Sequence, residues 1–220
     1  MTQTIRSTFQ DELVKLQSLV LDLASEVKSN GELLLEFLQN KENVNELFFK
    51  IKNKDKEIDK ARWQVHDYGD QLIVLQQPVA KDFRYIIVSI QITDNLERIG
   101  DDCKKTAKLL EKVSLSDIGI PQEIINMAKL GNQMLSESIN AYRSLFGEKT
   151  NEIAALDDQV DTLYKLTISK IINLIKKSPE EKIDSLSKLF FIAQSFERGA
   201  DHAAKIGQLV NFAVTGKREK

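Results

Sequence analysis

Apolar residues recur along this chain at intervals of three and four residues, the spacing that places them on one face of an α-helix. Runs that alternate apolar and polar residues, typical of β-strands, are not seen in the sequence. The pattern predicts six long helices and an all-α fold. We place these helices at about residues 8–28 with a continuation to 38, 44–76, 79–113, 122–145, 151–177 and 179–214.

Few residues interrupt the helical pattern, because the chain has only nine glycines and three prolines. Asn30-Gly31 could break or kink the first helix, although the apolar pattern resumes at Leu33. Pro78 should end the second helix, since the residue before a proline is disfavoured in the helical conformation. Ser178 and Pro179 are expected to be the N-cap and the first residue of the last helix.

The sequence also repeats itself at an offset of about one hundred residues. Residues 94–101 (DNLERIGD) match residues 194–201 (QSFERGAD), and both copies contain Glu-Arg-x-x-Asp. An internal duplication explains this similarity. The sequence therefore predicts two tandem three-helix bundles, at residues 1–115 and 116–220, joined by a linker at about residues 114–121.

Each repeat carries matched pairs of carboxylates four residues apart, and residues at this spacing lie on the same side of a helix. The pairs are Asp55/Asp59 and Glu97/Asp101 in the first repeat, and Asp157/Asp161 and Glu197/Asp201 in the second. If the second helix of each unit packs on the third, four carboxylates converge. They then need a cation, or they raise one another's pKa values.

Oxygen-only ligands suit Mg²⁺, Ca²⁺ or Mn²⁺, and carboxylate clusters also hold iron. His66 lies in line with Asp59 and is either a further ligand or an ordinary surface residue. The alternative is a solvated acidic face neutralised by the neighbouring cations Arg98, Lys104 and Lys108. The spacing of the carboxylates leaves both interpretations open.

Composition excludes several classes of protein. The formal net charge is −2 with both signs interspersed, which argues against nucleic-acid binding. No apolar run approaches the roughly 20 residues that span a bilayer, and the first residues lack the apolar centre of a signal peptide. The single cysteine, Cys103, rules out an internal disulfide framework. A cytoplasmic protein that does not insert into membranes is expected.

An enzyme is not expected. The enzyme class with helix-borne carboxylates is the ferritin-like di-metal oxidase, which requires Glu-x-x-His on two helices. Neither His66 nor His202 has a glutamate three residues before it. The sequence also shows no glycine-rich phosphate loop, no Ser/His/Asp set and no reactive cysteine motif.

At the repeated motifs the sequence resembles the PhoU family. The similar segments are QPVAKDFR at residues 77–84, DNLERIGD at residues 94–101 and FERGADHA at residues 196–203. The resemblance covers almost the whole chain and implies two PhoU domains of three helices each. Asp102 departs from it, since many members have histidine there.

The resemblance also implies metal binding at the Glu/Asp-x-x-x-Asp motifs, with the metal open among iron, zinc, manganese and magnesium. The implied ligands are Glu97 and Asp101, Glu197 and Asp201, with Asp55, Asp59, Asp157 and Asp161 as partner carboxylates. No catalytic residue is implied.

The function implied is negative regulation of phosphate uptake and phosphate-regulon signalling. It would act through contacts with the phosphate ABC transporter and its phosphate-sensing histidine kinase, and the protein would be a homodimer. Two alternatives stay open: an accessory protein of another phosphate transporter, and a helical adaptor that binds no metal.

Overall fold

The computed structural model describes residues 2–39, 44–113, 118–145 and 150–218, and these residues form six long α-helices. The helices are α1 (Thr2–Gln39), α2 (Val44–Gln76), α3 (Ala80–Leu110), α5 (Gln122–Ser144), α6 (Thr150–Lys177) and α7 (Glu180–Thr215). The all-α fold is confirmed. The predicted boundary between residues 115 and 116 lies outside the described residues.

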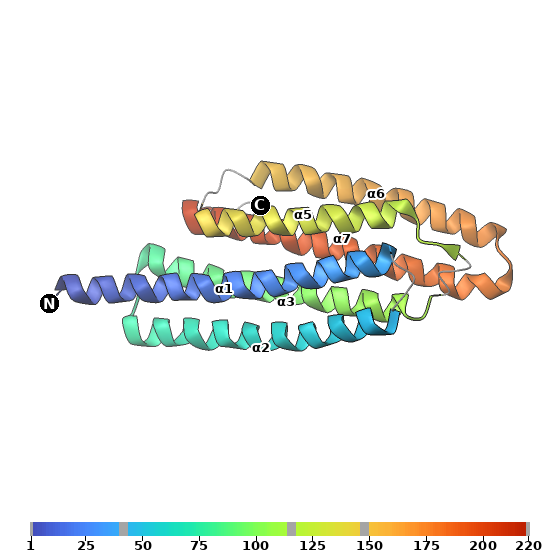
Figure 1. Ribbon diagram of the computed structural model, residues 1–220. Coiled ribbons are helices and arrows are strands. Elements are labelled where there is room, and N and C mark those ends of the chain that lie inside the picture. Colours follow the sequence, from blue (N-terminus) through green and yellow to red (C-terminus); the bar gives the residue numbers. More distant parts are fainter. Residues whose placement is uncertain (1, 40–43, 114–117, 146–149, 219–220) are drawn as a thin grey trace.

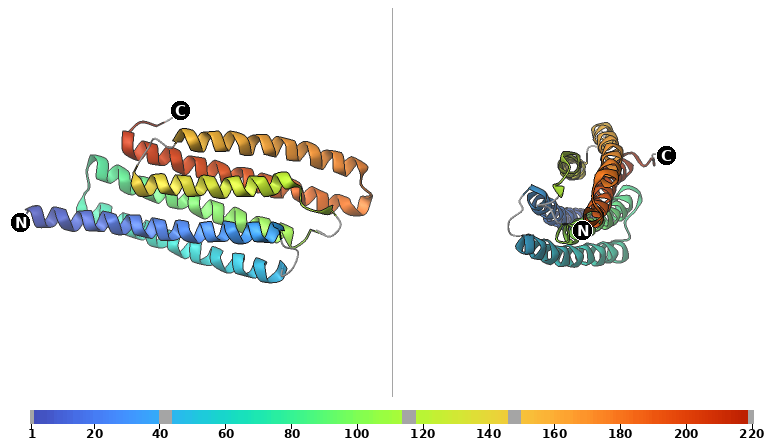
Figure 2. Two further views of the ribbon diagram at one scale, coloured as in Figure 1. Left: turned by 45° about the horizontal axis from the view of Figure 1, so that its top comes forward. Right: turned by 90° about the vertical axis from the view of Figure 1, so that its right-hand side faces the viewer.

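The six helices run along one common long direction, with α1–α3 in one half of the molecule and α5–α7 in the other (Figure 1). The end-on view in Figure 2 shows two three-helix units stacked on each other. Within each unit every helix contacts the other two, and the units meet through α3 with α7 and α1 with α5. The prediction of two tandem three-helix bundles is confirmed.

Two clusters of buried apolar side chains fill the space between the helices, and each cluster draws on both units. The first includes Leu16, Ile92, Met134 and Ala203, and the second includes Phe37, Leu110, Ile124 and Leu189. The apolar core is therefore divided along the length of the molecule and not between the units. Because burial of apolar surface is the main stabilising term, the two units stabilise each other.

Polar side chains lie between the two apolar clusters, in the C-terminal third of α1 and α3 and near the middle of α5 and α7. They surround a cavity of about 40 Å³, which has room for a few water molecules. Its lining includes Gly31, Asp102, Thr106, Asn132 and Ser195. Both carboxylate oxygens of Asp102 and the hydroxyl of Thr106 are buried and make no hydrogen bond with the described residues. We call this group the central polar layer.

Two details at helix ends and breaks differ from the predictions. Helix α1 continues through Asn30 and Gly31, so the expected interruption is absent. Gly31 leaves room for the Asn132 side chain of α5, whose Oδ1 lies where a Cβ on residue 31 would stand. The predicted N-cap at Ser178 is wrong by one residue, because Pro179 has an extended backbone and α7 begins after it. Within the described residues, no helix is both long and apolar enough to cross a membrane.

Candidate functional site

Each unit brings together the carboxylates of its two matched motifs. The first cluster contains Asp55, Asp59, Glu97 and Asp101, and the second cluster contains Asp157, Asp161, Glu197 and Asp201. Helix α2 packs on α3 in the first unit, and α6 packs on α7 in the second. The expected pairing of the second and third helices of each unit is thus present.

Gly100 lies at the close approach of α2 and α3 beside the first cluster. A Cβ at this position would lie 3.1 Å from Ile58 Cδ1 of α2, tighter than an ordinary contact. Gly100 stands between Glu97 and Asp101 in the motif, so the absent side chain lets these carboxylates approach the acidic face of α2. The corresponding residue of the second repeat is Ala200, which is buried.

The first cluster is neutralised from within. Lys104 Nζ donates hydrogen bonds to Asp55 Oδ2 at 2.6 Å and to Asp101 Oδ1 at 2.9 Å. Lys105 Nζ lies 3.3 Å from Asp101 Oδ2. Because Asp55 is only 4% exposed, its carboxylate depends on the Lys104 ammonium as its partner.

The pKa shifts in the first cluster follow from burial and this lysine. Burial opposes ionisation of Asp101, but hydrogen bonds and charges from Lys104 and Lys105 outweigh it and lower the pKa. For Asp55 burial outweighs the same lysine, and its pKa is raised. Burial, and then the charge of Asp101, raise the pKa of Glu97. The charges of Asp55 and Asp101 are compensated by lysines, while the charge of Asp101 still repels that of Glu97.

Among the described residues, no lysine or arginine makes an ion pair with a carboxylate of the second cluster. Burial, and then the charges of Asp201, Asp161 and Asp158, raise the pKa of Asp157 to about 6. Burial and repulsion within the cluster likewise raise the pKa values of Glu197 and Asp201. Each carboxylate therefore makes ionisation of its neighbours less favourable.

The ion pairs found in the described part of α5–α7 use other carboxylates. Lys170 pairs with Glu123, Lys188 with Asp184, and Arg198 with Asp102. The position that matches Lys104 at the repeat offset of 100 is Ala204. The second copy therefore lacks the amine that joins the two helices of the first cluster.

The two donor sets differ in how well they suit a metal ion. In the described part of the chain, no three carboxylate, imidazole or thiolate side chains are gathered closely enough to hold one as placed. The second cluster offers oxygen donors that repel one another and lack a cation, so its chemistry fits a hard metal ion once the side chains turn together. The first cluster does not fit while Lys104 lies between its carboxylates.

The two histidines lie outside both clusters. His66 Nε2 is 3.0 Å from Asp94 Oδ1, and Arg62 Nη2 is 2.8 Å from the same oxygen. His202 Nδ1 is 3.1 Å from Asn95 Oδ1, a contact that joins α7 to α3 across the two units. Neither histidine is placed to complete a cluster, and the suggestion of His66 as a further ligand is not supported.

Sequence reasoning missed the central polar layer. Asp102 was noted only as a departure from the family pattern, yet it is 3% exposed and lies 3.5 Å from Arg198 Nη2 of the other unit. Its position directly after Asp101, next to the apolar stripe of α3, was the available signal. A charged residue at a position facing the apolar core is unusual enough to deserve a structural explanation.

The substitution Asp157→Asn should raise the free energy of unfolding of the metal-free protein by roughly 1 kcal/mol at pH 7. The pKa of Asp157 is raised from 3.8 to about 6, so the folded protein holds this proton more tightly than the unfolded chain does. The contribution of Asp157 to stability therefore falls as the pH rises from about 4 to about 6, and it stays unfavourable above that. Asparagine carries no charge and removes the penalty.

Urea denaturation in the presence of a chelator at pH 7 and pH 4 measures this effect. The gain should be present at pH 7 and absent at pH 4, where Asp157 is already protonated in the folded state. The control is Asp158→Asn, which removes the same formal charge from an exposed neighbour. An equal gain in the control, or a gain that persists at pH 4, would refute the assignment.

Comparison with known proteins finds one family. The chain matches the PhoU domain twice, over residues 20–110 and 124–210. Helices α1–α3 contain the first match and α5–α7 the second. Together the matches cover well over half of the chain.

Relatives of similar length carry the same description. A phosphate-specific transport system accessory protein PhoU homolog of Clostridium acetobutylicum is 29% identical over 216 residues, which are 97% of each chain. A protein of the same description from Zymomonas mobilis is 30% identical over 216 residues, 96% of this chain and 88% of the relative. The crystal structure of the phosphate transport system regulatory protein PhoU from Streptococcus pneumoniae has a TM-score of 0.89 and 27% identity, covering 96% of this chain and 99% of that one.

Proposed function

The chain belongs to the PhoU family, and on that premise we propose that it is a negative regulator of phosphate uptake and phosphate-regulon signalling. The observation that carries this proposal is similarity over almost the whole length, with both domains present, to accessory proteins of phosphate-specific transport. The coarser role, an accessory or regulatory protein of phosphate transport, follows directly from family membership. Repression when phosphate is plentiful is the finer part.

The regulator would act through protein contacts and not through catalysis. Its proposed partners are the phosphate ABC transporter and the phosphate-sensing histidine kinase, met in the cytoplasm by a homodimer. Large apolar side chains on the surface support this mode of action, since exposed apolar groups that gather at one place often mark interaction sites. Val74, Leu75, Val79 and Phe83 are exposed around the turn from α2 to α3.

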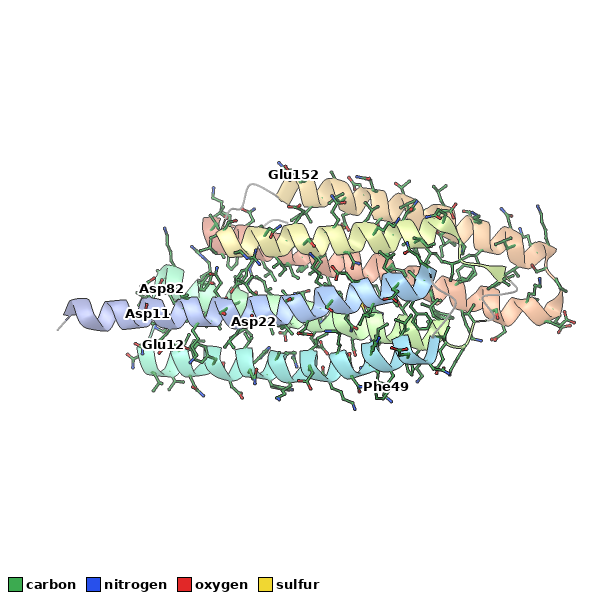
Figure 3. All side chains as sticks on the ribbon, in the orientation of Figure 1. Asp11, Glu12, Asp22, Phe49, Asp82 and Glu152 are labelled. Atoms are coloured by element: carbon green, nitrogen blue, oxygen red, sulfur yellow. The ribbon has the colours of Figure 1, made fainter. Side chains whose placement is uncertain are left out.

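Two further large apolar side chains are exposed along α2. Phe49 is 63% exposed and points away from the other helices (Figure 3). Trp63, on the same helix, is 58% exposed, with the Arg62 guanidinium over its ring and the His66 ring tilted against it. Neither side chain is used by the cores, so both are available to a partner.

Metal binding is the part of the proposal that concerns the carboxylates. Asp157, Asp161, Glu197 and Asp201 would hold the ion, which would neutralise their mutual repulsion and join α6 to α7. Support comes from their oxygen-only donors and from the absence of an internal cation among the described residues near them. Iron, zinc, manganese and magnesium remain the candidate metals.

Deletion of the gene tests the regulatory role. In a phosphate-rich medium, a reporter of the phosphate regulon should be silent in the parent strain, active in the deletion strain and silent again when the gene is restored. An unchanged reporter together with altered phosphate uptake would instead indicate an accessory protein of another phosphate transporter. Unchanged reporter expression together with unchanged phosphate uptake would contradict both the regulator and the accessory-protein hypotheses.

The same assay tests the adaptor alternative. A restored gene carrying Glu197→Ala and Asp201→Ala should fail to silence the reporter if the second cluster is needed for regulation. The matched variant Glu97→Ala with Asp101→Ala removes the same charges from the first cluster. Full repression by the first of these variants would favour a helical adaptor that binds no metal.

A further inference from the structure

The two carboxylate clusters are copies of each other in sequence, yet one side chain between the carboxylates distinguishes them. In the first cluster the Lys104 ammonium lies 2.6 Å from Asp55 Oδ2 and 2.9 Å from Asp101 Oδ1, and so joins α2 to α3. In the second copy the corresponding residue is Ala204, which has no amine. The cation of the first cluster is thus part of the chain.

We propose that the ammonium group of Lys104 holds the place of a bound cation, so that the first cluster excludes a metal ion and only the second cluster is open to one. This inference rests on the proposed metal binding of the family's carboxylate motifs. A metal ion entering the first cluster would meet a positive charge at contact distance. It would also have to displace two hydrogen bonds between charged groups.

Burial of the Asp55 carboxylate favours retention of the Lys104 ion pair in the first unit. Asp55 is 4% exposed, so removing its partner would leave a carboxylate without compensation. In the second cluster Asp201 is exposed to solvent. The contact of α2 with α3 is therefore independent of metal, whereas the contact of α6 with α7 is the one that a metal ion would strengthen.

Manganese binding by the full chain tests the inference. The starting variant carries Glu197→Gln and Asp201→Asn, which disable the second cluster while keeping the side chains close to their original size. Equilibrium dialysis against Mn²⁺ should find no manganese held by this variant. Adding Lys104→Met to it should create binding in the first cluster, at manganese concentrations where the starting variant holds none, which corresponds to an affinity at least ~10-fold higher.

The control for charge is Lys108→Met in the same starting variant. Lys108 is an exposed lysine on the same helix, so the substitution removes one positive charge without opening the cluster. It should not create manganese binding. Far-UV circular dichroism of each variant establishes that the helices are intact.

The reciprocal substitution uses the second cluster of the otherwise unchanged chain. Ala204→Lys places an amine at the position that matches Lys104 of the first repeat, and this position is partly exposed. It should weaken manganese binding by at least ~10-fold. This test does not depend on whether Lys104→Met weakens the fold.

Three results would overturn the inference. The first is manganese retained by the starting variant while Lys104 is present. The second is unchanged binding after Lys104→Met or after Ala204→Lys. The third is the absence of manganese binding in every chain, which would also remove the metal from the proposed function. The regulatory role would then still be judged separately, by the reporter of the phosphate regulon.

Discussion

Replacing Phe37 with alanine should lower the free energy of unfolding by about 3–5 kcal/mol. Phe37 is fully buried in the second apolar cluster, near the end of α1. This cluster joins both units, since it also contains Ile124 of α5 and Leu189 of α7. The substitution would remove an aromatic ring from a packed core and leave a cavity that neighbouring helices can only partly fill.

Urea denaturation followed by circular dichroism measures the loss, and Val14→Ala is its control. Val14 lies on the same helix but is 65% exposed, so truncating it should change the stability by less than about 0.5 kcal/mol. The Phe37 variant should still unfold in a single transition, because the cluster crosses both units. A separate early transition of one unit, or a loss no larger than that of the control, would contradict the shared core.

Replacing Asp102 with leucine should raise the free energy of unfolding by about 1–3 kcal/mol. The carboxylate of Asp102 is buried, and neither oxygen accepts a hydrogen bond from the described residues. Its nearest cations are Arg198 at 3.5 Å and Lys105 at 3.6 Å. Both are about half exposed, so they can return to water when the carboxylate is removed. A leucine side chain would also fill part of the 40 Å³ cavity.

The variant Asp102→Asn separates the two parts of this effect. It removes the charge but keeps a polar group of the same size, so its gain should be smaller than that of leucine. Denaturation of the three chains at neutral pH gives the comparison. If leucine destabilises the protein by 1 kcal/mol or more, on the order of one lost hydrogen bond, then ordered water or the ion pair with Arg198 stabilises the central polar layer.

A stabilising result would have a functional meaning. Residues that lower the stability of a protein are often retained because its activity requires them. A buried polar group between two packed units can be such a residue. Asp102 connects the first unit to Arg198 of the second. The effect of Asp102→Leu on repression of the phosphate regulon should therefore be measured together with its effect on the free energy of unfolding.

The sequence alone was sufficient for the secondary structure and the duplication. The three-and-four spacing of apolar residues predicted all six helices, since periodicity is a local property of the chain. Errors lay at the ends of helices, as at Ser178, where local signals compete. The sequence left open whether Asn30-Gly31 breaks the first helix, and the structure shows α1 continuous there, with Asn132 of α5 packed against Gly31.

The sequence also predicted which side of each helix carries the carboxylates. The i, i+4 spacing placed Glu97 and Asp101 together, and the repeat placed Glu197 and Asp201 in the same way. In the sequence, Lys104 is one of three cations near the acidic face, with Arg98 and Lys108. Its spacing of three residues from Asp101 is local, but its bond to Asp55 spans 49 positions of the chain.

Tertiary structure decided what these faces meet. Periodicity fixes the direction of a side chain around its own helix, but not the neighbouring helix or the distance to it. Ile58 of α2 packs against Gly100 of α3, and in this arrangement of the two helices Lys104 reaches both Asp55 and Asp101. The stacking of the units likewise placed Asp102 in a buried polar layer between two shared apolar cores, because only the assembled helices exclude water from that position.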